Sequence, residues 1–266
     1  MGAPVAAHLK DLGHDIAGFD LADGDDLLDV AAVRRAADGC AAVVHAAAIP
    51  HDTAGTPEAI MSVNVLGTWH VLLAAESAGA GRVVHFSSAQ VFGTAAGERL
   101  PDYLPLDDAH PRRATRAYGI SKCLSEDLCE RFTAGTGVPT VALRPVWVWD
   151  PGMYGRIAER WRADPAAEWT PFWELGAFVD VRDVAAAVER ALTVPLAGHH
   201  RALLAAADIA ASRPSLDSAA RLAPGVPVRD PGAYGDDPWR ALTDCSAAEL
   251  VLGWRPRYTW AGRGGR

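Results

Sequence analysis

The hydrophobic and polar positions of this chain follow two different periodicities over most of its length. Unbroken apolar runs of strand length lie at 40–48, 82–88 and 138–149. Residues 57–79 and 118–132 instead carry apolar side chains three and four positions apart, which is the spacing of one helix face. Strands of a parallel sheet are buried on both sides and therefore have continuously apolar sequences. The pattern predicts an α/β fold in which a doubly wound parallel sheet has helices on both faces.

Weaker signals extend this prediction towards both ends of the chain. An opening helical segment ends at Gly13 and leads into a short strand at 15–20. A helix is expected over 30–38. Residues 176–194 repeat the order of strand and helix, with Asp183 as the predicted N-cap of that helix. These segments fit the same alternation of strand and helix.

The pattern changes after Asp150, where a second structural unit is expected. Residues 151–175 place tryptophans among prolines and charged residues, and residues 195–266 are rich in Pro and Arg with only short periodic segments. We therefore predict a sheet domain formed by 1–150 plus 176–194. A small C-terminal lobe, formed by 151–175 plus 195–266, is expected to bind the substrate.

Composition and charge exclude several classes of protein. Half of the 266 residues are hydrophobic, and the formal net charge is −8. An acidic balance disfavours nucleic acid, whose phosphates attract clustered Lys and Arg. The four cysteines form no CxxC pair, so neither a metal site nor a disulfide framework is predicted. With no signal peptide and no apolar run long enough to cross a bilayer, the sequence predicts a cytoplasmic protein without a membrane partner.

The stretch YGISK, from Tyr118 to Lys122, carries the most specific chemical signal. Residues four apart lie on one face of a helix, one turn from each other. A free phenol has a pKa of about 10, and a neighbouring ammonium group lowers that pKa. The pair can therefore move a proton to or from a substrate hydroxyl. The alternative is an ordinary helix start with an exposed lysine, because the pattern also occurs by chance.

A second candidate lies upstream, where the segment HFSSAQVFG ends a predicted strand. Ser88 in this segment can donate a hydrogen bond to the oxygen that Tyr118 serves. Taken alone, a serine at a strand end more often satisfies backbone groups. However, the carboxyl end of one parallel strand and the start of the next helix share the edge where such sheets bind ligands. The combination favours an active site at that edge.

Several motifs, taken in order, resemble the NAD-dependent epimerase/dehydratase family of the extended short-chain dehydrogenases/reductases. They are GFD (18–20), GDDLLD (24–29), VVHAAA (43–48), SVNVLGT (62–68), FSSAQVFG (86–93), YGISK, LRPVWVWDP (143–151) and FVDVRDVA (178–185). The resemblance implies that the sheet domain is a Rossmann-like dinucleotide-binding domain. It also implies that Tyr118 is the catalytic acid/base, that Lys122 binds the nicotinamide ribose, and that Ser88 orients the substrate hydroxyl.

The same resemblance assigns cofactor contacts. Asp20 would accept hydrogen bonds from the adenosine ribose and repel the 2′-phosphate of NADP, so NAD is predicted, although Arg34 or Arg35 could still reach that phosphate. Asn64 is assigned a structural role at a helix kink near Lys122, with a solvent-facing position as the alternative. No metal is implied. The predicted cofactor-binding residues are Gly2, Asp20, Asp26, Leu27, Ala46, Ala47, Ala48, Asn64, Ser87, Tyr118, Lys122, Pro145 and Val148.

The start of the chain departs from the family pattern. Family members begin with a strand and a glycine-rich turn, GxxGxxG, which lets the backbone approach the pyrophosphate. Counting back from Gly13, Gly2 occupies the place of the third glycine. Either the start of the chain is assigned too late, or the protein is truncated. In the first case, a chain that begins at Met1 would bind cofactor poorly. The completeness of the other motifs favours the first interpretation.

The resemblance also bears on the reaction. Dehydratases of the family carry an acidic pair where Ala89 and Gln90 follow Ser88, which argues against dehydration. We expect NAD-dependent oxidation or epimerisation at a secondary alcohol of a sugar, a nucleotide sugar or a similar small polyol, in a homodimer formed through the helices of Asn64 and Tyr118. The alternative is a non-catalytic dinucleotide-binding regulator. The residues expected near the substrate, with core packing as the alternative for the tryptophans, are Ser88, Gln90, Trp147, Trp149, Met153 and Tyr154.

Overall fold

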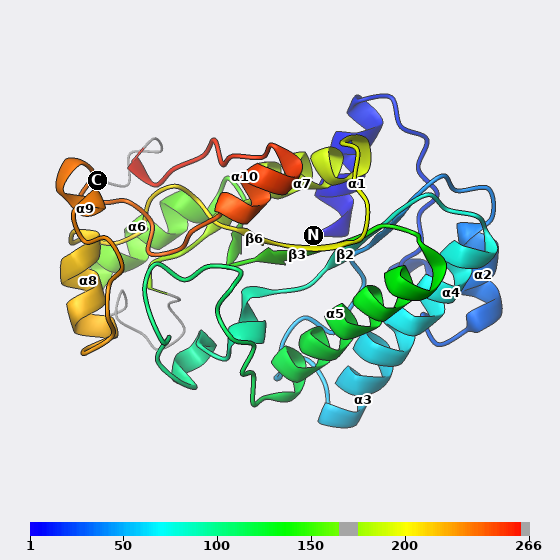
Figure 1. The fold of residues 1–266 in the computed structure, drawn as a ribbon, viewed down its shortest axis with the longest axis horizontal. Helices are drawn as coiled ribbons and strands as arrows, with labels where there is room; N and C mark the ends of the chain where they lie inside the picture. Colours follow the sequence, from blue (N-terminus) through cyan, green and yellow to red (C-terminus); the bar gives the residue numbers. More distant parts are fainter. Residues whose placement is uncertain (165–174, 262–266) are drawn as a thin grey trace.

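The computed structural model describes residues 1–164 and 175–261, and a four-stranded sheet forms its centre. Every neighbouring pair of strands runs parallel, in the order β1-β2-β3-β6 (Figure 1). The predicted α/β fold with a parallel sheet is therefore confirmed. The strands are β1 (Val43–His45), β2 (Val83–Phe86), β3 (Thr140–Pro145) and β6 (His199–Leu204).

Helices cover both faces of this sheet (Figure 1). The helices on one face are α1 (Gly2–Asp11), α7 (Val181–Thr193) and α10 (Ser246–Leu252). Those on the other face are α4 (Gly67–Ser77) and α5 (Ala117–Thr136). Side chains alternate along a strand, so Val84 and Phe86 of β2 pack on the first face and Val83 packs on the second. This double covering explains why β1, β2 and β3 are mainly apolar.

The predicted helix over 57–79 forms one continuous helical run. It comprises α3 (Pro57–Met61), a π-helical turn (Ser62–Leu66) and α4. By length and composition this run could cross a bilayer, contrary to the prediction that no such segment exists. The core helix of a globular domain meets the same criterion, and α4 packs Leu72 and Ala75 against the sheet.

The smaller unit beside the sheet contains two apolar clusters. One is an aromatic cluster with Trp149, Tyr154, Phe178 and Trp260 at its centre, and the other includes residues of α8 (Ser215–Leu222) and α9 (Ala233–Asp236). A separate two-stranded parallel sheet pairs β4 (Val148–Trp149) with β5 (Val179–Asp180), although the sequence pattern assigns both segments to the sheet domain. Trp169 and Trp173, which follow Trp147 and Trp149 closely in sequence, lie outside the described residues. The helices of the lobe are α6 (Met153–Ala163), α8 and α9.

The remaining elements are short. The predicted helix over 30–38 is present as α2 (Val30–Ala37), and Asp29 caps it by accepting two first-turn amides. The 3₁₀ turns are Leu21–Asp23, Ala89–Phe92 and Ala95–Gly97.

Two predictions about strands are wrong. Residues 15–20 form no strand, because no described residue pairs with them and an isolated strand has no ladder bonds to stabilise it. The sequence pattern assigns 195–266 to the small lobe, but β6 lies in this range and pairs with β3 over its whole length. Its sequence, HHRALL, begins with polar residues and therefore gives no clear apolar run.

The N-cap of α7 also differs from the prediction. Asp180, rather than Asp183, caps the helix by accepting the amide of Arg182 at 2.9 Å. Asp183 is buried in the first turn, where its carboxylate accepts the amides of Arg257 and Tyr258. It therefore holds the C-terminal segment of the chain against α7.

A buried carboxylate, Glu126 of α5, joins this helix to three strands. It accepts two bonds from Arg144 of β3, of 2.8 and 2.7 Å. Ser87 at the end of β2 donates to it at 2.6 Å, and Arg201 of β6 donates at 3.1 Å. Burial by itself would raise the pKa of Glu126, but the hydrogen bonds from Arg144 and Ser87 hold that pKa below its usual value. The carboxylate therefore stays charged inside the protein.

We predict that Glu126→Gln lowers the free energy of unfolding by about 3 kcal/mol or more, because it leaves the buried guanidinium of Arg144 with Asp108 as its one remaining carboxylate partner among the described residues. The control is Glu130→Gln, which removes an exposed partner of Arg201 and should cost less than about 1 kcal/mol. Denaturant unfolding of both variants gives the comparison. Equal losses of stability would contradict the central role of Glu126.

Candidate active site

Tyr118 and Lys122 lie one turn apart at the start of α5, as the sequence predicts. Because α5 connects β2 to β3, its N-terminus lies at the edge where these parallel strands end. The Lys122 ammonium nitrogen lies 5.7 Å from the centre of the Tyr118 ring. Both side chains are buried by the surrounding protein. At this distance a positive charge stabilises a phenolate over a phenol.

Lys122 carries a charge that is almost fully removed from water. Its Nζ donates to the backbone oxygen of Phe86 at 2.7 Å. Burial lowers the pKa of Lys122 from 10.5 to about 8, against the opposing influence of Cys129 and Glu126. Most of the lysine is still protonated at neutral pH, so an ammonium group faces the phenol.

The two serines after β2 have different roles. Ser88 caps the turn Ala89–Phe92, and its oxygen accepts the amide of Gln90 at 3.2 Å. This bond uses the oxygen of Ser88 as an acceptor and leaves its proton for a substrate oxygen. Ser87 instead donates its hydroxyl to Glu126. The Ser87 hydroxyl is therefore committed to Glu126, and the cofactor contact of Ser87 stays a prediction.

Close packing holds the first turn of α5 against the turn that follows Ser88. A Cβ atom on Gly119 would lie 2.8 Å from the backbone oxygen of Gln90 and 2.7 Å from the Cβ of Ala114. Only glycine permits this approach, which fixes Tyr118 relative to Ser88. Gly119 lies inside the YGISK motif, but the spacing of Tyr118 and Lys122 gives no sign of this contact.

Asn64 holds the loop after β1 against α5. Its Oδ1 accepts the amide of Ile49 at 2.8 Å, and its Nδ2 donates to the Ile49 oxygen at 3.1 Å and to Ser121 Oγ at 3.0 Å. Asn64 lies in the π-helical turn, which matches the predicted helix distortion. These bonds favour a structural role over direct contact with a cofactor.

Two buried histidines beneath the site lie outside the sequence predictions. His45 Nε2 bonds to Thr68 Oγ1 at 3.0 Å, and the His85 ring lies 5.3 Å from the His45 ring. Burial, reinforced by the charge of Lys122, lowers the pKa of His45 to about 3 and that of His85 well below its usual value. Both rings are therefore neutral at physiological pH and add no second positive charge beside Lys122. Their positions in apolar strands gave no sign of this packing.

The residues predicted to hold the cofactor include a set that fits a dinucleotide. Ala46, Ala47 and Ala48 follow β1 directly and present only methyl groups, which leaves their backbone accessible. Asp20 is exposed and presents a carboxylate suited to ribose hydroxyls. Gly2 begins α1, whose start has no side-chain cap, so the amides of Gly2 and Ala3 could bind a pyrophosphate, while Pro4 has no amide to donate.

The other predicted cofactor residues differ in how far they are buried. The Leu27 side chain packs in the core against α2 and α4, and the contact of Leu27 with adenine stays a prediction. Asp26 is exposed, and its carboxylate accepts the amide of Leu28. Pro145 is buried at the end of β3, and Val148 is half-buried in β4.

The residues predicted to line the substrate site divide into two groups. Trp149 is fully buried in the aromatic cluster, and the Tyr154 hydroxyl donates to buried Asp180 at 2.9 Å. Both are core residues, so their predicted substrate contacts are wrong. Trp147 and Met153 are only half-buried against the same cluster and stay candidates, as does half-buried Gln90.

Comparison with known proteins places most of the chain in one family model. The model of the NAD dependent epimerase/dehydratase family matches residues 1–205. Uronate dehydrogenase from Pseudomonas putida is 35% identical over 121 residues, which are 45% of this chain and 42% of the relative. UDP-glucose 4-epimerase from Rhizobium meliloti is 30% identical over 120 residues, 44% of this chain and 35% of the relative. The chain therefore matches less than half of the length of these relatives.

Solved structures match the fold over nearly the whole chain. A short-chain dehydrogenase/reductase superfamily protein from Agrobacterium tumefaciens, with bound NAD, has a TM-score of 0.72 and 26% identity and covers 98% of this chain and 91% of its own. MoeE5 in complex with UDP-glucose and NAD has a TM-score of 0.70 at 22% identity and covers 99% of this chain and 93% of its own. The second likeness supports the fold alone.

We predict that Lys122→Met raises the free energy of unfolding near neutral pH, by about 3 kcal/mol at most, because it removes a buried charge. The folded-state pKa of Lys122, about 8, lies below its unfolded value. The wild-type protein therefore becomes more stable as the pH rises from below about 8 towards 10.5, the usual pKa of lysine. The difference in the free energy of unfolding between the two proteins then becomes smaller.

Denaturant unfolding of both proteins across this pH range tests the prediction. The exposed lysine Lys10 provides the control, since Lys10→Met should leave the pH profile unchanged. A Lys122→Met variant less stable than wild type at neutral pH would show that the ammonium is better compensated than its burial indicates.

Proposed function

Because this chain belongs to the NAD-dependent epimerase/dehydratase family, we propose that it is an NAD-dependent oxidoreductase that acts on a secondary alcohol of a sugar or a sugar acid. One observation carries the proposal. Tyr118 lies next to the Lys122 ammonium at the ligand-binding edge of the sheet, and the packing of Gly119 holds the Ser88 turn against the same helix turn. NAD is the cofactor of the family, in agreement with the sequence prediction.

In the proposed mechanism, each residue has a separate task. Ser88 donates a hydrogen bond to the substrate hydroxyl oxygen and fixes its position. Tyr118, with its phenolate favoured by Lys122, accepts the hydroxyl proton as the carbonyl forms. Bound NAD supplies the acceptor for the hydride. The buried, neutral histidines leave Lys122 as the positive charge that favours the phenolate.

The relatives and the residues after Ser88 both indicate the class of substrate. The named relatives act on a uronate and on UDP-glucose, by their titles. Ala89 and Gln90 supply no acidic pair for dehydration, which leaves oxidation and epimerisation. We favour oxidation of a free sugar acid, because the uronate dehydrogenase relative has the higher identity. The half-buried Trp147 offers an aromatic face for a sugar ring.

We predict that Tyr118→Phe lowers kcat by about 100-fold or more while NAD binding is retained, because only the proton acceptor is removed. The assay follows NADH formation with glucuronate, galacturonate, UDP-glucose and UDP-glucuronate. Chromatography of the sugar products detects epimerisation, which forms no net NADH, and calorimetry measures NAD binding. Tyr103→Phe is the control, since it also loses one phenol hydroxyl and a bond to Asp107. NAD binding without turnover of any substrate by the wild-type protein would support the non-catalytic alternative.

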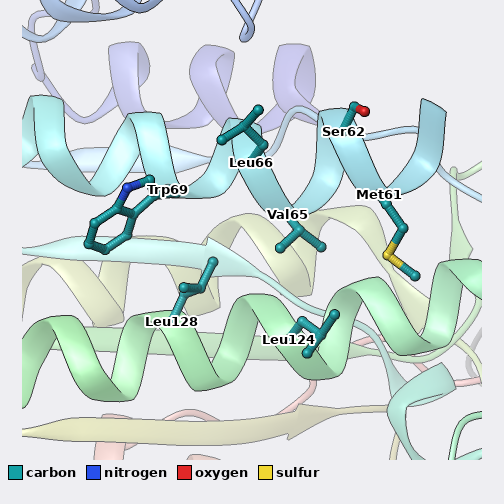
Figure 2. Close-up of a pocket in the computed structure, with 7 residues that line it drawn as sticks. All are labelled: Met61, Ser62, Val65, Leu66, Trp69, Leu124 and Leu128. Atoms are coloured by element: carbon teal, nitrogen blue, oxygen red, sulfur yellow. The ribbon is translucent and has the colours of Figure 1, made fainter. Parts of the chain in front are cut away.

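We also propose that the protein is a homodimer. The groove in Figure 2 is lined by side chains from two neighbouring helices. Leu66, Trp69 and Leu124 leave more than a third of their surface exposed there, which is costly for large apolar side chains on adjacent helices. A second copy of the same face would cover them in an isologous contact. The lining residues are Met61, Ser62, Val65, Leu66, Trp69, Leu124 and Leu128.

Leu124→Glu should convert the dimer to a monomer, because it places a charge in the centre of the apolar contact. Analytical ultracentrifugation over a range of concentrations measures the change. Leu250→Glu serves as the control, since Leu250 is 87% exposed and lies outside the groove. A wild-type protein that stays monomeric at all concentrations would contradict the dimer.

A further inference from the structure

The start of α5 is capped by a residue from a distant loop. Arg116, the residue at the N-cap position, makes no side-chain hydrogen bond to the helix. Instead, the amide of Tyr118 donates to Oδ1 of Asp52 at 2.8 Å, across 66 positions of sequence. This is the bond that an N-cap side chain normally makes with the second residue of a helix. Asp52 therefore supplies the cap from outside the helix.

The oxygen of the same residue is also restrained. Tyr118 O accepts the hydroxyl of Ser121 at 2.7 Å, and Ser121 Oγ accepts Nδ2 of Asn64 at 3.0 Å. Asn64 in turn is bonded twice to the backbone of Ile49. Both backbone polar groups of Tyr118 are thus connected to one segment, residues 49–52.

The segment that carries these bonds follows β1 and the residues Ala46–Ala48. The fold places this segment at the same edge of the sheet as the start of α5. Asp52 bonds directly to the Tyr118 amide, and Ile49 is connected to the Tyr118 oxygen through Asn64 and Ser121, so the first helix turn is held at two points. A carboxylate at a helix N-terminus also interacts favourably with the helix dipole.

We infer that Asp52 is a positioning residue of the active site, which holds the Tyr118 phenol in the orientation required for proton transfer. The inference rests on the proposed oxidoreductase function and adds a residue to it. Asp52 does not touch the reacting atoms and acts only through the backbone of Tyr118. Displacement of a reacting group by about 1 Å can cost roughly 100-fold in rate, so loss of this cap should be visible in kcat.

The test compares three variants of the full chain with the wild-type protein. Asp52→Asn keeps an oxygen acceptor for the Tyr118 amide, and Asp52→Ala removes it. Asp244→Ala is the matched control, because Asp244 also accepts a first-turn amide, that of Ser246 at the start of α10. For each protein, turnover, the KM for NAD, thermal unfolding and hydrogen exchange of the Tyr118 amide are measured.

The inference predicts that Asp52→Ala lowers kcat by roughly tenfold or more with little change in the KM for NAD. Asp52→Asn should restore most of this rate. Asp244→Ala should lose a comparable amount of thermal stability and keep its kcat. If Asp52→Ala keeps its kcat, or if Asp244→Ala loses the same fraction, Asp52 is only a helix cap and the inference is wrong.

Failure of the proposed function has a different signature. If the wild-type protein turns over none of the substrates, the oxidoreductase proposal fails, and hydrogen exchange then decides the positioning role by itself. Faster exchange of the Tyr118 amide in Asp52→Ala, but not in Asp52→Asn, supports the anchoring by Asp52. Unchanged exchange in both variants overturns it.

Discussion

The buried carboxylate of Glu126 is the constraint on which the active-site edge depends. A charge removed from water must be met by hydrogen bonds, and Arg144, Ser87 and Arg201 supply them from three strands. These partners are far apart in sequence, so the network can form only when β2, β3, β6 and α5 are in register. Once it has formed, the rotation of α5 about its axis is fixed. That rotation decides which residues of the helix face the end of β2.

The same rotation gives α5 two different faces. One face carries Lys122 and Glu126 towards the sheet, and another carries Leu124 and Leu128 into the groove between α5 and the helical run of α3 and α4. Tyr118 lies at the first turn, where the inward face meets the open edge of the sheet. A single helix thus supplies the buried ion network, the proton-transfer pair and an apolar surface.

The site combines features that oppose folding with features that compensate them. Lys122 is held as a buried ammonium, and His85 is enclosed without a hydrogen-bond partner in the described part of the chain. Both cost free energy. The apolar packing on the two faces of the sheet offsets that cost, and the bonds from Asp52, Asn64 and Glu126 concentrate rigidity around Tyr118. The apolar packing of the core therefore stabilises a fold in which the burial of Lys122 and His85 is unfavourable.

The sequence by itself determined the features that depend on local periodicity. The long helices, the apolar strands of the sheet and the pairing of Tyr118 with Lys122 all follow from the spacing of residues close together in the chain. Only the tertiary structure decided the features that depend on partners. Residues 15–20 have the pattern of a strand but pair with no described strand. Ser87 donates a hydrogen bond to Glu126, and Trp149 and Tyr154 are buried in the core. The contact between Asp52 and Tyr118 is of the same kind, because a hydrogen bond between residues 66 positions apart leaves no pattern in either local sequence.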